Sequence, residues 1–194
     1  RHIAVYPEGL QAKQGISLNG MWKYKIQSSE PPAYPRYQAD YQPFGDVYLD
    51  FKHSSSALNY RRELDLSTAI SRTTYSVNGV NYTREYFVSQ PHQAIVIHLS
   101  ANKKGSLNFE TILSSPHKAY TTRKVDDKTL ALSLKVRNGA LRGESFLRIE
   151  SKKGKVSVSE KGISVAGADE VTLYLTAATN FVNYNDVSGN PVSA

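Results

Sequence analysis

Apolar and polar residues alternate along most of this chain, and the period of the alternation is two. That period is typical of a β-strand with one buried face, because successive side chains point to opposite sides of a sheet. Residues 45–51 show it clearly, with Val47, Leu49 and Phe51 on one face. We therefore predict a half-buried strand in this segment.

Residues 58–66 alternate in the same way. One face of this segment carries the charged side chains of Arg61, Glu63 and Asp65. The other face carries Tyr60, Leu64 and Leu66. The pattern predicts a second strand whose apolar face is buried.

Residues 74–83 contain the clearest turn signal of the chain, Asn78 followed by Gly79. Both residue types tolerate positive φ, which a type I′ turn requires at its two central positions. Alternating residues flank the pair on both sides, so the segment is predicted to be a β-hairpin.

The rest of the chain is predicted to be a series of short strands separated by turns. Residues 94–99 are almost continuously apolar and are predicted to form a central strand, and residues 157–165 and 171–177 the last strands. Turn signals lie at regular intervals, at residues 104–105, 126–127, 138–139, 153–154, 161–162 and 167. Helical periodicity is absent beyond one short turn at residues 67–70. This pattern predicts an all-β protein, a large antiparallel β-sandwich (supersandwich-like) with little or no helix.

The first forty residues differ from the rest in composition. Residues 30–35 include three prolines and cannot form a central strand, because proline lacks the amide donor. We predict that residues 1–40 form an extended or strand-like segment that joins the sandwich, and that residues 41–194 form the sandwich itself. The length of 194 residues suits one such domain.

Charge and composition narrow the possible partners. The net charge is +7, but the lysine pairs at residues 103–104 and 152–153 lie beside glycines in predicted turns, and no nucleic-acid recognition motif accompanies them. No apolar run reaches the roughly 18 residues of a membrane helix. Cysteine is absent, and the chain begins at Arg1 rather than Met, which fits removal of a signal peptide. We expect an exported bacterial protein, periplasmic or extracellular, with neither a nucleic-acid partner nor a membrane span.

Candidate catalytic and metal-binding groups are scattered. An independent glycosidase needs two facing carboxylates. The available ones are Asp46, Asp50, Glu63, Asp65 and Glu85. They alternate with apolar residues and lie near Arg61, Arg62 and Arg84, so surface ladders of paired charges are the simpler interpretation. The five histidines show no ligand spacing, and His98 is predicted to be a hydrogen-bonded strand residue. We predict no catalytic residue, metal or cofactor in this chain.

Aromatic residues gather near the N-terminus, and aromatic rings bind the apolar faces of sugars. The candidates for carbohydrate binding are Trp22, Tyr24 and Tyr37. The alternative is that these rings pack in the core or an interface, since tyrosine is an ordinary strand residue.

Four segments, in order, resemble the N-terminal domain of glycoside hydrolase family 95, the α-L-fucosidase family. They are residues 41–51, 60–66, 82–89 and 177–191. Two departures stand out: His92 follows Pro91 where that family usually has Asp, and residues 16–24 replace the family's usual opening. Residues 16–24 instead resemble the Leu-Asn-Gly-x-Trp opening of sugar-binding sandwich domains in other glycosidases.

The resemblance implies a β-sandwich, a helical linker and an (α/α)6 catalytic barrel, with the residues of an inverting mechanism in the barrel. The barrel is expected beyond Ala194, so this chain would be a non-catalytic module that packs on the barrel and shapes its entrance. Its parent would be a glycoside hydrolase acting on α-L-fucosides or related α-L-galactosides. Predicted contacts with the barrel are Tyr41, Phe44, Phe181 and Tyr184. The alternative function is a stand-alone or accessory carbohydrate-binding module that takes an oligosaccharide.

Overall fold

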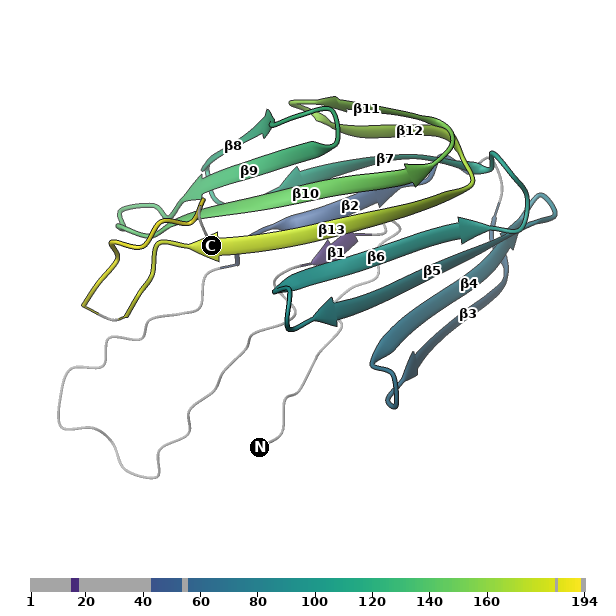
Figure 1. The fold of residues 1–194 in the computed structure, drawn as a ribbon, viewed down its shortest axis with the longest axis horizontal. Coiled ribbons are helices and arrows are strands. Elements are labelled where there is room, and N and C mark those ends of the chain that lie inside the picture. Colours follow the sequence, from purple (N-terminus) through teal and green to yellow (C-terminus); the bar gives the residue numbers. More distant parts are fainter. Residues whose placement is uncertain (1–14, 18–42, 54–55, 184, 193–194) are drawn as a thin grey trace.

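The computed structural model describes residues 15–17, 43–53, 56–183 and 185–192. These residues form thirteen strands and no helix, in two antiparallel sheets of five and eight strands (Figure 1). The predicted all-β sandwich is therefore confirmed.

The smaller sheet has the order β1-β2-β7-β12-β11. Its strands are β1 Gly15–Ser17, β2 Asp46–Asp50, β7 Leu107–Ser114, β12 Gly162–Ala168 and β11 Lys155–Ser159. The larger sheet has the order β3-β4-β5-β6-β13-β10-β9-β8. Its strands are β3 Leu58–Asp65, β4 Ile70–Val77, β5 Val80–Ser89, β6 Ala94–Ala101, β13 Glu170–Thr179, β10 Arg142–Lys152, β9 Thr129–Lys135 and β8 Ala119–Lys124.

The hairpin predicted at Asn78 and Gly79 joins β4 to β5. Their φ angles are 51° and 76°, and Val77 pairs with Val80 across the turn. Positive φ at both central residues is the signature of a type I′ turn, whose twist matches that of the flanking strands. The prediction from the local sequence is confirmed.

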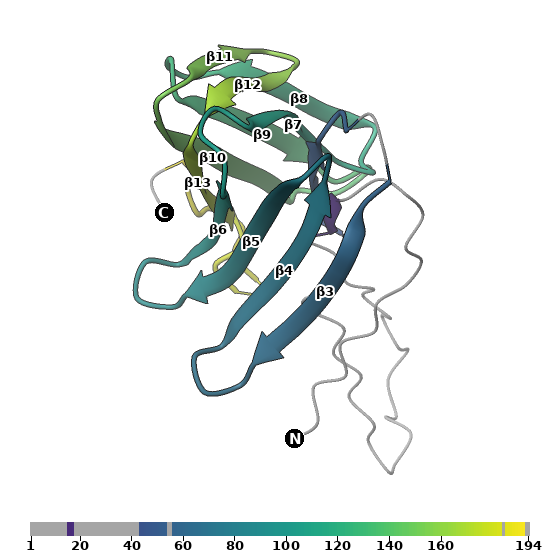
Figure 2. The same cartoon turned by 90° about the vertical axis from the view of Figure 1, so that its right-hand side faces the viewer.

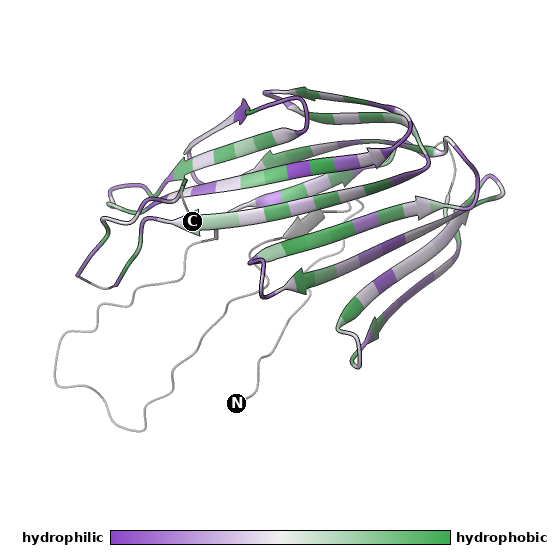
Figure 3. Ribbon diagram, viewed as in Figure 1, coloured by the Kyte–Doolittle hydropathy of each residue, from purple (hydrophilic) through white to green (hydrophobic). Residues whose placement is uncertain are grey.

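Apolar and polar residues alternate along the strands (Figure 3), and the buried apolar residues of both sheets form one core cluster. Strand β6 is central to the larger sheet, as predicted, and its Ile97 and Leu99 are fully buried. From the smaller sheet, Val47 and Phe109 pack into the same cluster. Alternation along β2, β6 and β7 thus places one face of each of these strands in the core.

Strands β3, β4 and β5 extend past the smaller sheet, and we call them the wing (Figure 2). Strand pairing aligns one row of residues on the core side of the larger sheet. The row runs from Leu173 through Ile97, Tyr86 and Ser71 to Leu64 on the edge strand. Burial falls along this row, because Leu173 and Ile97 are 0% exposed and Leu64 is 61% exposed. The row continues the core face to a strand that the smaller sheet does not cover.

Residues 58–66 are therefore correctly predicted as a strand but wrongly predicted as half-buried. Tyr60, Leu64 and Leu66 are exposed, and β3 is an edge strand. The physical reason is that alternation reports which side chains share a face, whereas coverage of that face depends on the other sheet.

Candidate docking site at one end of the large sheet

Antiparallel pairing brings three connections between strands, and the segment after the last strand, to one end of the larger sheet. They are residues 66–69, 90–93, 136–141 and 180–192. The register shows this directly, because Asp65 pairs with Ile70, Ser89 with Ala94, and Gly143 with Thr179. We call this edge of the molecule the exit end, since the last described residues lie there (Figure 1).

Asn180 attaches residues 180–192 to the sheet. It is 1% exposed, its Oδ1 accepts from the amide of Arg142 at 2.7 Å, and its own amide donates to the Arg142 carbonyl at 3.1 Å. Its Nδ2 donates to the carbonyls of Ala140 at 3.1 Å and Val187 at 2.7 Å, and its carbonyl accepts from Gly189 at 3.1 Å. A buried amide side chain with all its groups satisfied specifies one arrangement of the surrounding backbone.

The loop beyond Asn180 is held by hydrogen bonds of its own. The amides of Val182 and Asn183 donate to the Asp186 carbonyl at 2.9 and 3.1 Å. The Asp186 carboxylate accepts from the amide of Ser188 at 2.8 Å, and hydrogen bonds from the side chain and the backbone of Ser188 lower the pKa of Asp186. These hydrogen bonds fix the described backbone of the loop, whereas the side chains of Phe181, Val182 and Asn183 are exposed.

Large apolar side chains are exposed on this fixed backbone. Phe181 and Val182 are each 54% exposed and Val192 is 57% exposed. Leu66 and Val88, beside two other connections at the same end, are 85% and 57% exposed. Larger groups of exposed apolar residues often mark interaction sites.

Phe181 is the one predicted barrel contact that the described residues place in this exposed group. Phe44 is partly buried and packs against the core, where a Cβ on Gly143 would lie 2.6 Å from its ring. Tyr41 and Tyr184 lie outside the described residues, as do the predicted sugar-binding residues Trp22, Tyr24 and Tyr37.

Arg84 is buried, whereas the sequence analysis predicted that it belongs to a ladder of paired charges on the surface. It is 4% exposed, lies over the rings of Phe51 and Tyr75 at 4.0 and 4.7 Å, and donates to the Tyr75 hydroxyl. The Tyr75 hydroxyl lies 3.1 Å from His53 Nε2. Burial and the Arg84 charge lower the pKa of His53, which fits a neutral ring accepting from Tyr75. Pairing across β4 and β5 turns Arg84 inward, which its sequence neighbours did not indicate.

The candidate carboxylates of the wing do pair on its outer face, as predicted. Arg72 bridges Glu63 and Glu85, at 3.5 and 2.7 Å, and Arg61 pairs with Glu63 at 2.7 Å. Asp65 accepts from the amide and hydroxyl of Ser67. Sequence analysis missed Arg72 because its partners lie 9 and 13 residues away and meet it only through strand pairing.

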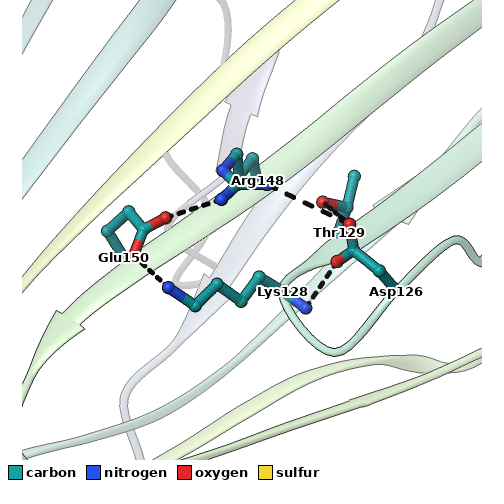
Figure 4. Close-up of polar contacts among 5 residues, drawn as sticks. All are labelled: Asp126, Lys128, Thr129, Arg148 and Glu150. Carbon is teal, nitrogen blue, oxygen red and sulfur yellow. Dashed lines mark hydrogen bonds and ion pairs between the residues drawn. The ribbon is translucent and has the colours of Figure 1, made fainter.

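A second charged ladder joins Arg148 and Glu150 of β10 to the turn before β9 (Figure 4). Glu150 accepts from Lys128 at 2.5 Å and from Arg148 at 2.9 Å, and these hydrogen bonds lower the pKa of Glu150. Asp126 accepts from the Lys128 amide at 2.7 Å and from Thr129 at 3.1 Å. Both carboxylates of this ladder, Asp126 and Glu150, are therefore engaged by hydrogen-bond donors.

The described histidines are hydrogen-bonded singly. His98 Nδ1 lies 3.1 Å from Thr172 Oγ1, as expected of a satisfied strand residue. His117 Nε2 donates to the Pro43 carbonyl at 2.9 Å. Within the part of the chain that the structure describes, no three metal-ligating side chains cluster, and no helix could cross a membrane.

Three comparisons relate this chain to known proteins. The family model described as glycosyl hydrolase family 65, N-terminal domain, matches residues 20–184. A relative named "Alpha-L-fucosidase 2", from Arabidopsis thaliana, is 35% identical over 167 residues, which are 73% of this chain and 20% of the relative. A solved structure titled "Putative kojibiose phosphorylase from human microbiome" is 14% identical, with a TM-score of 0.45 over 71% of this chain and 20% of that one. The chain thus spans about a fifth of the length of both.

Proposed function

We propose that this chain, which belongs to the family of glycosyl hydrolase family 65 N-terminal domains, is the non-catalytic sandwich of a larger enzyme that hydrolyses α-L-fucosides. The observation that carries the proposal is the extent of the matches: the family model covers the sandwich, whereas the fucosidase relative is five times longer than the matched part. In this proposal the sandwich packs on a helical catalytic barrel and shapes its entrance.

The matched family carries the number 65, whereas the resemblance of four sequence segments indicated family 95. Both descriptions agree on an N-terminal domain of a glycoside hydrolase. The fucosidase relative supports the assignment of the parent enzyme to family 95 and to α-L-fucosides, and we include that finer assignment in the proposal.

The chemistry of the described residues supports a non-catalytic role. Glycoside hydrolysis requires two carboxyl groups separated by about 5–10 Å across the scissile bond. Among the described residues, Glu144 is the most buried carboxylate, at 6% exposed, and it forms an ion pair with Arg123 at 2.6 Å on the outer face of β10. The Glu144 carboxylate is thus held in a structural ion pair with Arg123.

Hydrolysis of 4-nitrophenyl α-L-fucoside tests the proposal. The 194-residue chain should release no nitrophenol, and the longer protein that carries it should release nitrophenol. Turnover by the 194-residue chain that disappears in the Glu144→Gln variant would show that the sandwich is itself the catalyst. The Glu150→Gln variant, on the same strand, is the matched control.

A further inference from the structure

We propose that the outer face of the larger sheet, the face turned away from the core, binds a flat and uncharged oligosaccharide. The two rings on which the sugar stacks are Phe87 of β5 and Tyr174 of β13. This site is separate from the aromatic candidates near the N-terminus. It goes beyond the proposed function, because it does not require that the parent enzyme hydrolyse α-L-fucosides.

Strand pairing places the two rings in one continuous row. Phe87 pairs with Val96 of β6, Val96 pairs with Tyr174, and Tyr174 pairs with Arg148 of β10. These four strands lie side by side in the larger sheet (Figure 1). Residues that lie directly opposite each other in an antiparallel pair share a face of the sheet. The row therefore crosses four strands on a single face.

The burial of neighbouring residues shows that this face is the outer one. Ile97 follows Val96 and Leu173 precedes Tyr174, and both Ile97 and Leu173 are 0% exposed and belong to the core. Successive side chains of a strand point to opposite faces of the sheet. Val96 and Tyr174 therefore point away from the core.

The two rings are exposed on either side of a covered aliphatic residue. Phe87 is 37% exposed and Tyr174 is 40% exposed, whereas Val96 between them is 7% exposed. We call these three residues the apolar strip. Neighbouring strands are about 4.8 Å apart, so the backbones that carry the two rings are separated by about 9–10 Å. An extended ligand can stack on both rings at once.

A row of polar side chains runs beside the apolar strip. Glu85 pairs with His98, His98 pairs with Thr172, and Thr172 pairs with Glu150. Each of them is two positions along its strand from a member of the first row, about 7 Å away on the same face. His98 Nδ1 lies 3.1 Å from Thr172 Oγ1. Imidazole, hydroxyl and carboxylate groups can exchange hydrogen bonds with sugar hydroxyls.

The charges of the polar row favour an uncharged sugar over a charged ligand or an apolar protein surface. Glu85 is paired with Arg72 at 2.7 Å, and Glu150 is paired with Lys128 at 2.5 Å. An apolar partner would remove water from these ion pairs, which costs free energy. Sugar hydroxyls can replace the hydrogen bonds of the water that they displace, while the apolar faces of the sugar stack on the rings.

Isothermal titration calorimetry of the 194-residue chain tests the site with two glucans of equal length. Cellohexaose is a flat, β-linked chain whose ring faces lie along a line, as the row of Phe87 and Tyr174 requires. Maltohexaose contains the same sugar in an α-linked, curved chain. Cellohexaose should bind at least about tenfold more tightly than maltohexaose. Equal dissociation constants, or no binding of cellohexaose, would overturn the proposal.

Leucine substitutions test the two rings. Phe87→Leu and Tyr174→Leu keep an apolar side chain beside Val96 but remove the flat ring, so each should weaken cellohexaose binding by about tenfold. Tyr174→Phe keeps the ring and should bind within about threefold of the parent. The matched control is Tyr120→Leu, which replaces a tyrosine of similar exposure, 38%, on β8 outside the row. Parent-like affinity in both ring variants would show that the site lies elsewhere.

A measurement on the unsubstituted chain keeps the test independent of the stability of the variants. Cellohexaose should shift the amide resonances of residues 85–87, 96–98 and 172–174 more than those of the hairpin at residues 77–80. Shifts confined to other strands would contradict the proposal. Dimerisation of the chain that Tyr174→Leu abolishes, without binding of cellohexaose, would make this face a contact between copies and the proposal wrong.

Activity of the longer protein on 4-nitrophenyl α-L-fucoside reports on the proposed function alone. The Phe87→Leu and Tyr174→Leu variants should keep that activity, because so small a substrate does not need the apolar strip. Binding of cellohexaose without fucosidase activity would overturn the proposed function and leave the oligosaccharide site standing. Fucosidase activity without binding of cellohexaose would do the reverse.

Discussion

Asn180 holds the backbone of Arg142 through its own backbone amide and its side-chain oxygen. The Asn180 amide donates to the Arg142 carbonyl at 3.1 Å, and Asn180 Oδ1 accepts from the Arg142 amide at 2.7 Å. The two residues continue the pairing of β13 with β10 beyond Thr179, and they lock the last described segment to the larger sheet.

Replacing Asn180 with alanine should destabilise the fold strongly. The change leaves the Arg142 amide and the Ala140 and Val187 carbonyls without their side-chain partner, and each buried unsatisfied group costs about 1–3 kcal/mol. These groups lie at an end of the sheet, where water can reach them. We therefore expect the free energy of unfolding to fall by about 2–4 kcal/mol, near the low end of the summed range.

Urea unfolding of the variant measures this loss. The control is Asn185→Ala, an exposed asparagine of the same loop, for which a change within about 0.5 kcal/mol is expected. Equal stabilities for the two variants would show that the Asn180 side chain does not hold the loop.

Replacing Gly79 with valine should destabilise the hairpin through backbone strain alone. Gly79 has a φ of 76°, and an added Cβ would meet no atom within 4 Å. A β-branched residue at positive φ is strained by about 1–3 kcal/mol. Gly79→Asn is the matched control, because asparagine tolerates this region and should lose less. Thermal melts that rank the two variants the other way would contradict the turn assignment.

Replacing Gly143 with alanine should destabilise the sandwich through a steric clash with Phe44. The new Cβ would lie 2.6 Å from Phe44 Cε2, so the ring must move. Overpacking of this kind costs about 1–3 kcal/mol. If the clash is the cause, Phe44→Leu combined with Gly143→Ala should lose less than the sum of the two single losses. Additive losses in chemical unfolding would assign the effect to the backbone of β10 instead.

Stability should fall with decreasing pH through protonation of His53. Burial and the Arg84 charge lower the pKa of His53 from its ordinary 6.5, so the unfolded chain takes up a proton more readily than the folded one. The free energy of unfolding then increases with pH below about 6.5 and levels off above it.

The free energy of unfolding should be measured between about pH 5 and 8, the range in which histidine titrates. An increase with pH is the expected result. His53→Gln keeps an acceptor for the Tyr75 hydroxyl and carries no titrating group, so its slope near pH 6 should be smaller than that of the parent. An unchanged slope would assign the pH dependence to other groups.

The sequence by itself determined the local features of this protein. Period-two alternation predicted the strands, and Asn78 with Gly79 predicted the hairpin, because both signals depend on neighbouring residues and on backbone geometry. The central position of residues 94–99 followed from their continuous apolar character. The His98 partner could be anticipated only as a requirement for a hydrogen bond; its identity, Thr172, depends on the pairing of β6 with β13.

Tertiary structure decided everything that depends on coverage and register. Leu64 alternates like a core residue but is exposed, because the smaller sheet stops short of the wing. Arg84 has the neighbours of a surface residue but is buried, because Phe51 lies over it. Asn180 gave no sign of its role, since its partners lie up to 40 residues away. A chain's local pattern sets which side chains share a face, whereas burial and partnership depend on which distant segment arrives to cover that face.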